Sequence, residues 1–353
     1  ESFSQNTTNE IKKIVKNLQL KHPEKIHGLI IDLRSNPGGL LEQAVSVSDL
    51  FIDSGIIVTT KGRSEETEYA EAEQSLAYYP LVVLLNSESA SASEILAGSL
   101  QDHNRAVIVG QPSFGKGSVQ TIFELPQHQA LKLTIARYLT PFGRSIQNVG
   151  IIPDLWLQPL YHNDSNENLF GENRYKNEGF LKNHLEQVQP QIRIDMKLPH
   201  FKGYYLTTPR AFAERNDPPE YANDIELQVA TNILQKISEV YGAHIPKEAR
   251  RSSHWLTLYG KELDGFLDKH NQEVAAWLDR QFDVEWSNAT NKVNPPLASD
   301  IGFKITRRDN APVAQGESVL FKWQVENKRA NAFERVSIFV SSHESFLPTK
   351  EIL

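Results

Sequence analysis

The sequence predicts an α/β fold built on a mostly parallel sheet, and three observations lead to it. Short apolar runs at 28–33, 81–85 and 106–109 lack polar alternation, which is typical of strands buried on both faces. Segments with a helical spacing of apolar residues, such as 9–21 and 91–102, lie between such runs or beside them. Strands that alternate with helices indicate parallel strands joined by crossover connections.

Three further stretches complete this first unit. Residues 56–60 are predicted to form another strand. Residues 119–125 and 131–138 alternate in polarity and are separated by a turn that contains Pro126, so they predict two successive strands. The α/β unit is therefore expected to cover residues 1–157.

The composition changes twice after this unit. Residues 158–195 are rich in Asn, Glu, Asp, Gln and Gly, which indicates a linker or an insert. Residues 196–290 are expected to form a helical accessory region, with amphipathic helices near 222–241 and 255–283. Residues 299–353 predict a β-rich, Ig-like segment that is too short for a complete sandwich.

Composition excludes several classes of function. The 353 residues carry 44 acidic and 37 basic side chains, a net charge of −7, so no basic face for nucleic acid is expected. Cysteine is absent, which rules out disulfides, thiolate nucleophiles and zinc–sulfur sites. No His pair has helical i, i+4 spacing beside a carboxylate, and no apolar run reaches 18 residues. We expect no metal and no other cofactor.

The segment from Gly110 to Lys116 has the spacing of a phosphate-binding loop. Such a loop requires Ser or Thr directly after the lysine and a helix that begins there, so that its N–H groups face the phosphates. Here Gly117 follows the lysine, Ser118 comes one position late, and the next residues favour a strand. The sequence therefore predicts no nucleotide site, and Lys116 needs another explanation.

Ser91 follows the apolar run 81–85 and precedes a predicted helix. A serine at such a sharp turn can expose its hydroxyl group, and the helix start supplies N–H groups for an oxyanion. The alternative is structural, because Ser91 and Glu94 have the spacing of a helix-capping box. Considered alone, this segment favours the cap.

Lys116 could act as the base for Ser91. The two residues follow neighbouring strands of a parallel sheet, whose carboxyl ends lie at one edge. The turn 36–39 ends a third strand at that edge, and its glycines allow close backbone approach. A lysine can accept the proton where burial lowers its pKa toward neutrality. His103 is the nearest candidate histidine, but it lies about 18 Å along the helix from Ser91.

Five motifs in order over residues 1–157 resemble the C-terminal processing (tail-specific) serine peptidases. The resemblance implies a ClpP/crotonase-like core, and the spacing of 25 residues between Ser91 and Lys116 also agrees with it. The motifs are Asp32-Leu33-Arg34-Ser35-Asn36-Pro37-Gly38-Gly39, Ser89-Ala90-Ser91-Ala92-Ser93-Glu94, Phe114-Gly115-Lys116-Gly117-Ser118-Val119-Gln120, Ala136-Arg137-Tyr138-Leu139-Thr140-Pro141-Phe142-Gly143-Arg144-Ser145-Ile146-Gln147 and Gly150-Ile151-Ile152-Pro153-Asp154.

The resemblance also implies roles for particular residues. Ser91 corresponds to the nucleophile, Lys116 to the general base, and Gln120 to the residue that orients the lysine. No metal or nucleotide takes part. The oxyanion hole corresponds to backbone N–H groups of Ala92 and of the turn at Gly38 and Gly39.

Two further positions stay open. Asp102 corresponds to an acidic position implicated in some members, but it lies three helical turns from Ser91, which favours a structural role. Arg34 either braces the turn 36–39, which carries the predicted oxyanion-hole N–H groups, or is an ordinary surface arginine.

By this resemblance the chain is expected to be a serine endopeptidase that cleaves proteins near exposed C-terminal tails through an acyl-enzyme. A bacterial periplasm or similar extracytoplasmic space is the expected location. The chain is expected to be a fragment that begins downstream of the family's PDZ domain. Adaptor binding is expected, if anywhere, in its C-terminal regions. The alternative is an inactive fragment or a scaffold of the same fold.

Overall fold

The structure is a computed structural model, and it separates into two compact units, Glu1–Trp277 and Leu278–Leu353. Each unit is considered by itself. The described residues are 2–22, 26–71, 76, 78–126, 129–161, 178, 201–207, 224–242, 245–282, 301–307, 321–327, 338–340 and 350–352.

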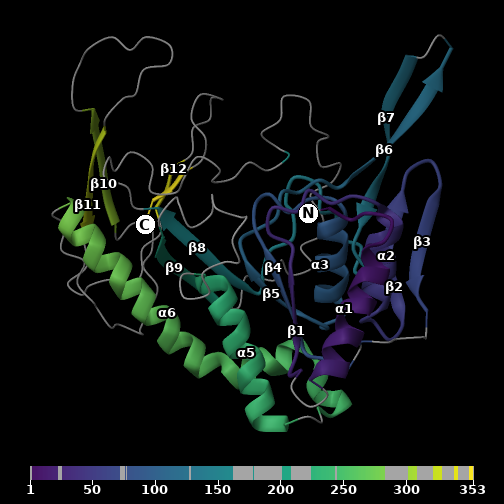
Figure 1. Cartoon of the computed structure of the whole chain (residues 1–353). Coiled ribbons are helices and arrows are strands. Elements are labelled where there is room, and N and C mark those ends of the chain that lie inside the picture. Colours follow the sequence, from purple (N-terminus) through teal and green to yellow (C-terminus); the bar gives the residue numbers. More distant parts are fainter. Residues whose placement is uncertain are drawn as a thin grey trace. The chain divides into compact units, whose positions relative to one another are not determined.

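A five-stranded parallel sheet forms the centre of the first unit (Figure 1). All four neighbouring pairs are parallel, which confirms the predicted sheet. The last strand comes from beyond residue 157, so the sheet contains more of the chain than the segment 1–157. In spatial order the strands are β1 (Leu29–Asp32), β4 (Leu81–Leu85), β5 (Val107–Gly110), β8 (Leu155–Tyr161) and β9 (Phe201–Thr207).

Helices cover both faces of this sheet (Figure 1). Residues of α1, α2 and α3 share one hydrophobic cluster with the sheet, and residues of α5 and α6 share the other. Helices α1, α3, α5 and α6 correspond to the segments predicted as helical at 9–21, 91–102, 222–241 and 255–283. The helix bounds are α1 (Thr7–Lys21), α2 (Leu41–Asp49), α3 (Ala92–Asp102), α5 (Ile225–Tyr241) and α6 (Ser252–Phe282), with the short 3-10 helix η3 (Lys247–Arg250) before α6.

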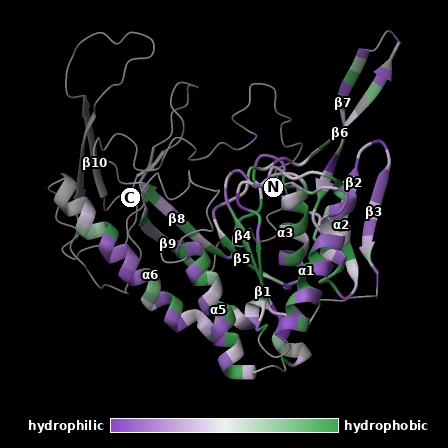
Figure 2. Cartoon of the chain, in the orientation of Figure 1, coloured by the Kyte–Doolittle hydropathy of each residue, from purple (hydrophilic) through white to green (hydrophobic). Residues whose placement is uncertain are grey.

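Strand β4 shows how both faces of the sheet are buried. Leu81, Val83 and Leu85 point into the cluster with α2 and α3, whereas Val82 and Leu84 point into the cluster with α5 and α6. Successive side chains of a strand alternate between faces, so an unbroken apolar run is required here. In Figure 2 the central strands are accordingly hydrophobic, and the helices carry mixed stripes.

A second, antiparallel sheet has the order β3-β2-β7-β6. The two strands predicted after residue 117 form its β6–β7 hairpin, and the strand predicted at 56–60 belongs to this sheet rather than to the parallel one. Strand β3 was not predicted. The bounds are β2 (Gly55–Lys61), β3 (Glu65–Ala70), β6 (Ser118–Leu125) and β7 (Gln129–Leu139).

In the C-terminal unit the structure describes two antiparallel pairs, β10–β11 and β12–β13. Most of the predicted Ig-like segment and most of the predicted linker at 158–195 lie outside the described residues. Both therefore stay predictions. The strands are β10 (Ile301–Arg307), β11 (Phe321–Asn327), β12 (Ile338–Val340) and β13 (Lys350–Ile352).

Candidate active site

Ser91 lies in the turn between β4 and α3, where it is the N-cap residue of the helix. Its φ is 56°, a left-handed value that costs a non-glycine residue about 1–3 kcal/mol. Hydrogen bonds hold the preceding turn: the Ala90 N–H donates to the Asn36 carbonyl at 3.0 Å, and the Ser89 hydroxyl donates to the Leu33 carbonyl at 2.8 Å. A strained serine between a strand and a helix is the arrangement that exposes a nucleophilic hydroxyl.

Glu94, in the first turn of α3, is completely buried, and its carboxylate accepts four hydrogen bonds. Oε1 accepts from the Ser113 hydroxyl and the Gly115 N–H, both at 2.6 Å. Oε2 accepts from the N–H groups of Ser91 at 2.8 Å and of Lys116 at 2.9 Å. Because these two donors share one oxygen, the two backbone nitrogens lie within about 6 Å of each other. Glu94 therefore joins the serine turn to the lysine loop.

The charge on Glu94 is stabilised by neutral groups. Burial raises the pKa of Glu94 to about 7, although the hydrogen bonds from Ser113, Gly115, Ser91 and Lys116 act in the opposite direction. None of the ion pairs found among the described residues includes Glu94. The carboxylate consequently depends on these four donors, and the donors depend on it.

The loop that carries Lys116 is held against residues 147–148. Gln147 Oε1 accepts from the Gly117 N–H at 3.1 Å, and the Asn148 N–H donates to the Gly115 carbonyl at 2.8 Å. Gly115 has a φ of 88°, and a Cβ on Gly117 would lie 2.7 Å from the Gln147 nitrogen. Both positions therefore require glycine. The side chain of Lys116 is half-buried at the end of this tight loop.

The structure also bears on the other classes of function considered for this chain. Strand β6 begins at Ser118, so no helix N-terminus follows Lys116 to receive a phosphate. Within the described ranges, no group of three or more His, Asp or Glu side chains could hold a metal ion. None of the described helices has both the length and the hydropathy of a membrane span.

The turn at Gly38 lies directly against Ser91. Gly38 has a φ of 98°, and a Cβ built there would lie 2.9 Å from the Ser91 Cβ, 2.6 Å from the Ala90 oxygen and 2.8 Å from the Ala92 nitrogen. Only glycine fits such a close approach. The Gly38 N–H donates to Asn36 Oδ1 at 2.9 Å, so it is engaged within the turn.

Two other N–H groups predicted for the oxyanion hole have no acceptor among the described residues, namely those of Gly39 and Ala92. Ala92 is the first residue of α3, where a backbone N–H has no partner within the helix. The positive end of the helix dipole also favours a negative charge at this point. Gly39 is fixed by Phe3, whose carbonyl oxygen would lie 2.3 Å from an added Cβ.

Gln120 lies on β6, next to a bulge in its pairing with β7. Its side chain is exposed, and its amide donates to Thr134 Oγ1 at 3.4 Å. The role predicted for Gln120, to orient the lysine, therefore stays a prediction.

Asp102 lies at the opposite end of α3 from Ser91. Its carboxylate is buried, pairs with Arg144 and accepts from the Phe142 N–H at 3.0 Å. The structure thus associates Asp102 with the turn after β7, about 16 Å along the helix from Ser91 at 1.5 Å per residue.

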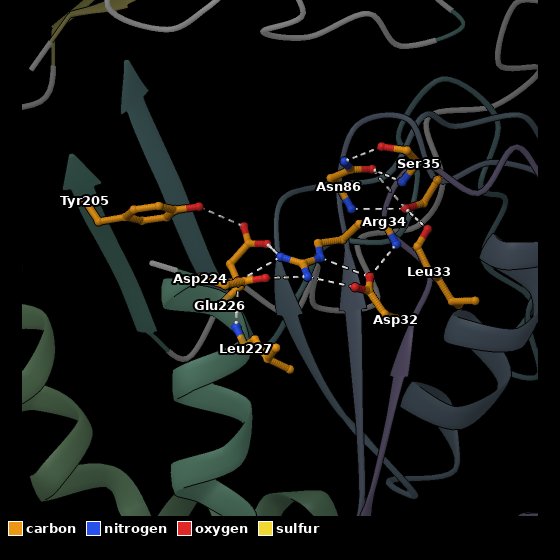
Figure 3. A network of polar contacts seen from close by, with 10 residues as sticks. Asp32, Leu33, Arg34, Ser35, Asn86, Tyr205, Asp224, Glu226 and Leu227 are labelled. Atoms are coloured by element: carbon orange, nitrogen blue, oxygen red, sulfur yellow. Dashed lines mark hydrogen bonds and ion pairs between the residues drawn. The ribbon is translucent and has the colours of Figure 1, made fainter. Parts of the chain in front are cut away.

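Arg34 is largely buried, with 8% of its side chain exposed. Its guanidinium contacts Asp32, Asp224 and Glu226 (Figure 3). Of the two alternatives left open for this residue, the ordinary surface arginine does not agree with this burial.

Sequence reasoning missed two residues of this site. Glu94 was noted only as half of a capping box, although that spacing was the available signal. Gln147 is fully buried and holds the loop 113–117, but the sequence indicates it only as a member of a longer motif. Nothing local in the sequence indicates that donors from 113–117 converge on these two side chains.

Comparisons with known proteins find relatives of similar sequence. The carboxy-terminal-processing protease of Bartonella bacilliformis is 50% identical over 163 residues, which make up 45% of this chain and 38% of that protein. The carboxy-terminal processing protease CtpA of Bacillus subtilis is 41% identical over 157 residues, 44% of this chain and 33% of that protein. The chain therefore spans less than two fifths of the length of these relatives.

Among solved structures, a photosystem II D1 C-terminal processing protease has 33% sequence identity and a TM-score of 0.41, and the match covers 50% of this chain and 46% of that one. The sequence model of peptidase family S41 matches residues 1–157. This segment contains all five motifs and the site built around Glu94. Residues 1–157 of this chain are therefore similar to peptidase family S41.

Proposed function

We propose that this chain carries the catalytic centre of a serine endopeptidase that cleaves proteins near their C-termini, with Ser91 as nucleophile and Lys116 as general base. The observation that carries the proposal is the shared hydrogen-bond acceptor: Glu94 Oε2 bonds to the backbone N–H groups of both residues. This contact holds the two backbones close enough for their side chains to meet. The similarity of residues 1–157 to peptidase family S41 supports the same serine-peptidase chemistry.

The first half of the reaction forms an acyl-enzyme. In its neutral form, Lys116 Nζ accepts the proton of Ser91 Oγ while that oxygen attacks the scissile carbonyl carbon. The carbonyl oxygen becomes negatively charged and accepts hydrogen bonds from the N–H groups of Gly39 and Ala92. Lys116 then donates its proton to the leaving amine, the C–N bond breaks, and an ester of Ser91 remains.

The second half releases the product. Lys116 accepts a proton from a water molecule, whose oxygen attacks the ester carbonyl. The same N–H groups stabilise the second tetrahedral intermediate. When it collapses, Ser91 Oγ leaves, takes back a proton from Lys116, and the carboxylic acid product departs. Apart from the substrate and this water molecule, the steps use only side chains and backbone groups of the chain.

Other residues have supporting roles in this proposal. Gln120 orients Lys116, and Gly38 allows the oxyanion turn to pack on Ser91. Asp102 stabilises the turn at Phe142 and takes no part in the catalytic steps. Substrates are proteins or peptides with exposed C-terminal tails, adaptors are expected to bind the C-terminal regions, and an extracytoplasmic bacterial location follows from the resemblance.

The test is cleavage of a protein that carries an unstructured C-terminal tail, with the cut sites identified by mass spectrometry. We expect Ser91→Ala to abolish cleavage and Lys116→Met to lower it at least about 100-fold, since a positioned base contributes about 10²–10⁴-fold. Lys132 is an exposed lysine on β7, so Lys132→Met is the matched control and should stay within about twofold. Wild-type cleavage by the Lys116→Met variant would contradict the role of Lys116 as the base. No cleavage by the wild type would indicate the inactive scaffold instead.

A further inference from the structure

Every N–H group of the Arg34 guanidinium has a hydrogen-bond acceptor (Figure 3). A guanidinium group has five N–H donors in a fixed planar arrangement. Nε and one Nη2 donor bond to Asp32 at 3.0 and 2.7 Å. Asp224 accepts from Nη1 at 2.9 Å and Nη2 at 2.7 Å, and Glu226 accepts from Nη1 at 3.0 Å. All five donors are thus held by three carboxylates.

Two of these carboxylates come from beyond the family match. Asp224 is the N-cap of α5, and Glu226 lies in the first turn of that helix. Glu226 is fully buried and also accepts a hydrogen bond from the Tyr205 hydroxyl on β9, at 3.3 Å. Two of the three side chains that hold Arg34 therefore belong to a part of the chain separated from it by about 190 residues.

The charges in this cluster depend on one another. Burial alone would lower the pKa of Arg34, but the bonds to Asp32 and Asp224 and the charge of Glu226 raise it overall. Burial raises the pKa of Glu226 to about 7, although the charge of Arg34 acts in the opposite direction. Removing Arg34 would leave the buried carboxylate of Glu226 without an opposite charge, which is far more costly than the net worth of the pair.

The oxyanion turn begins at the residue after Arg34. Ser35 has a left-handed φ of 53° and donates its N–H to Asn86 Oδ1 at 2.8 Å. The carbonyl of Asn36 accepts from the Ala90 N–H and the Ser93 hydroxyl, both at 3.0 Å, on either side of Ser91. A displacement of Arg34 would therefore be transmitted to the turn that packs on Ser91.

We propose that Asp224 and Glu226 are positioning residues that hold the oxyanion turn 35–39 against Ser91 through Arg34. This inference rests on the proposed function for its catalytic consequence. It assigns the start of α5, which the family match does not include, to the catalytic centre. Strand β9 and helix α5 then complete the peptidase core in place of belonging to a separate accessory module.

Asp224→Ser is the sharpest test of this proposal. Asp224 also caps α5 by accepting from the Leu227 N–H at 3.0 Å, and serine is an equally good N-cap that is too short to bridge Arg34. We expect kcat to fall at least about 10-fold with KM within about threefold, because an oxyanion donor acts mainly in the transition state. Arg34→Lys should have a similar effect, because an ammonium group cannot contact three carboxylates.

The matched control is Ile237→Val, which truncates a buried side chain in the same helix without altering the carboxylates. Its kinetics should equal those of the wild type. If Asp224→Ser fails to fold, Glu226→Gln replaces it, since it keeps the shape of the side chain and removes only the charge. A loss in Ile237→Val equal to that of the Asp224 or Glu226 variant would overturn the proposal.

A second readout does not depend on activity. Amide hydrogen exchange over peptides that cover residues 33–40 should be at least about 10-fold faster in Asp224→Ser, and unchanged in Ile237→Val. Unchanged exchange in both Asp224→Ser and Arg34→Lys would overturn the role of the two carboxylates. Faster exchange in a chain whose wild type cleaves nothing would support the positioning role and contradict the proposed function alone.

Discussion

Two buried carboxylates, Glu94 and Glu226, share a pKa of about 7 but are stabilised in different ways. Glu94 has only neutral donors, all contributed by segments within the family match. Glu226 lies beside the Arg34 guanidinium and a second carboxylate, Asp224. The first arrangement holds backbone groups of the proposed catalytic residues, whereas the second joins that part of the chain to a later helix. Burial raises both pKa values, but each oxygen of Glu94 accepts two hydrogen bonds, whereas Glu226 Oε1 accepts one from Tyr205 and Oε2 one from Arg34.

Glu94→Gln tests this distinction with the largest expected effect. A glutamine has one acceptor oxygen, and its amide N–H₂ would face two of the four donors, leaving backbone N–H groups at Ser91 or Lys116 unpaired. We expect kcat/KM for tail cleavage to fall at least about 100-fold, since small displacements of reacting groups are that costly. Glu88 is an exposed glutamate of the preceding loop, so Glu88→Gln should keep wild-type kinetics. An active Glu94→Gln enzyme would remove the proposed link between nucleophile and base.

The pH dependence of stability separates the two carboxylates further. Each pKa is raised from 4.5 to about 7 by folding, so each group favours the folded state at low pH and loses that contribution as the pH rises through 7. We expect Glu226→Gln to cancel about 2–3 kcal/mol of this loss between pH 5 and pH 8. Glu94→Gln should cancel a similar amount but be less stable at every pH, because it leaves N–H groups unpaired. Urea unfolding at several pH values measures both, and equal stability of the two variants would contradict the comparison.

Asp102 is a third buried carboxylate, and its partners indicate a role in stability rather than in catalysis. It pairs with Arg144 and caps the Phe142 N–H, away from Ser91. Asp102→Asn should lower the free energy of unfolding by about 2 kcal/mol, because Arg144 loses a charged partner. The rate constant for acylation of Ser91 should stay within about threefold. A loss of acylation in a stably folded variant would assign Asp102 to the chemistry.

The smallest effect is expected at Gln120. Its side chain is exposed and bonded to Thr134, so any orienting contact with Lys116 has to form during catalysis. We expect Gln120→Ala to lower kcat by about 3- to 10-fold without a change in the melting temperature. Thr134→Val, which removes the present partner of the amide, should have no such effect. Identical kinetics for both variants would withdraw the role of Gln120.

Much of the fold could be predicted because its signals are local. The apolar run 81–85 predicted β4 to the residue, and the alternating run after residue 117 predicted the β6–β7 hairpin. Strand β3 was missed because its sequence, EETEYA, has few apolar side chains and depends on pairing with β2. Strand β9 was missed because residues 201–207 lie in a region dominated by helical patterns, and only β8 gives them a partner.

The site was predictable to the extent that its chemistry is carried by short motifs. The proximity of the Ser91 and Lys116 backbones could be predicted because neighbouring parallel strands end at one edge. The contacts of Glu94 with the loop 113–116 could not be predicted, because a capping box at the start of α3 already accounts for a glutamate at this position. The partners of Arg34 could not be predicted either, since Asp224 and Glu226 lie some 190 residues away and nothing in their local sequence indicates a basic partner.

The central claim is that Ser91 is a nucleophile activated by Lys116, and covalent labelling tests it most directly. The chain is incubated with a serine-reactive phosphonate, and the modified residue and its rate of modification are determined by mass spectrometry. The account predicts a single adduct on Ser91, none in Ser91→Ala, and a rate at least about 100-fold lower in Lys116→Met than in Lys132→Met. Modification of Ser91 at the same rate in both lysine variants, or an adduct that survives in Ser91→Ala, would contradict it.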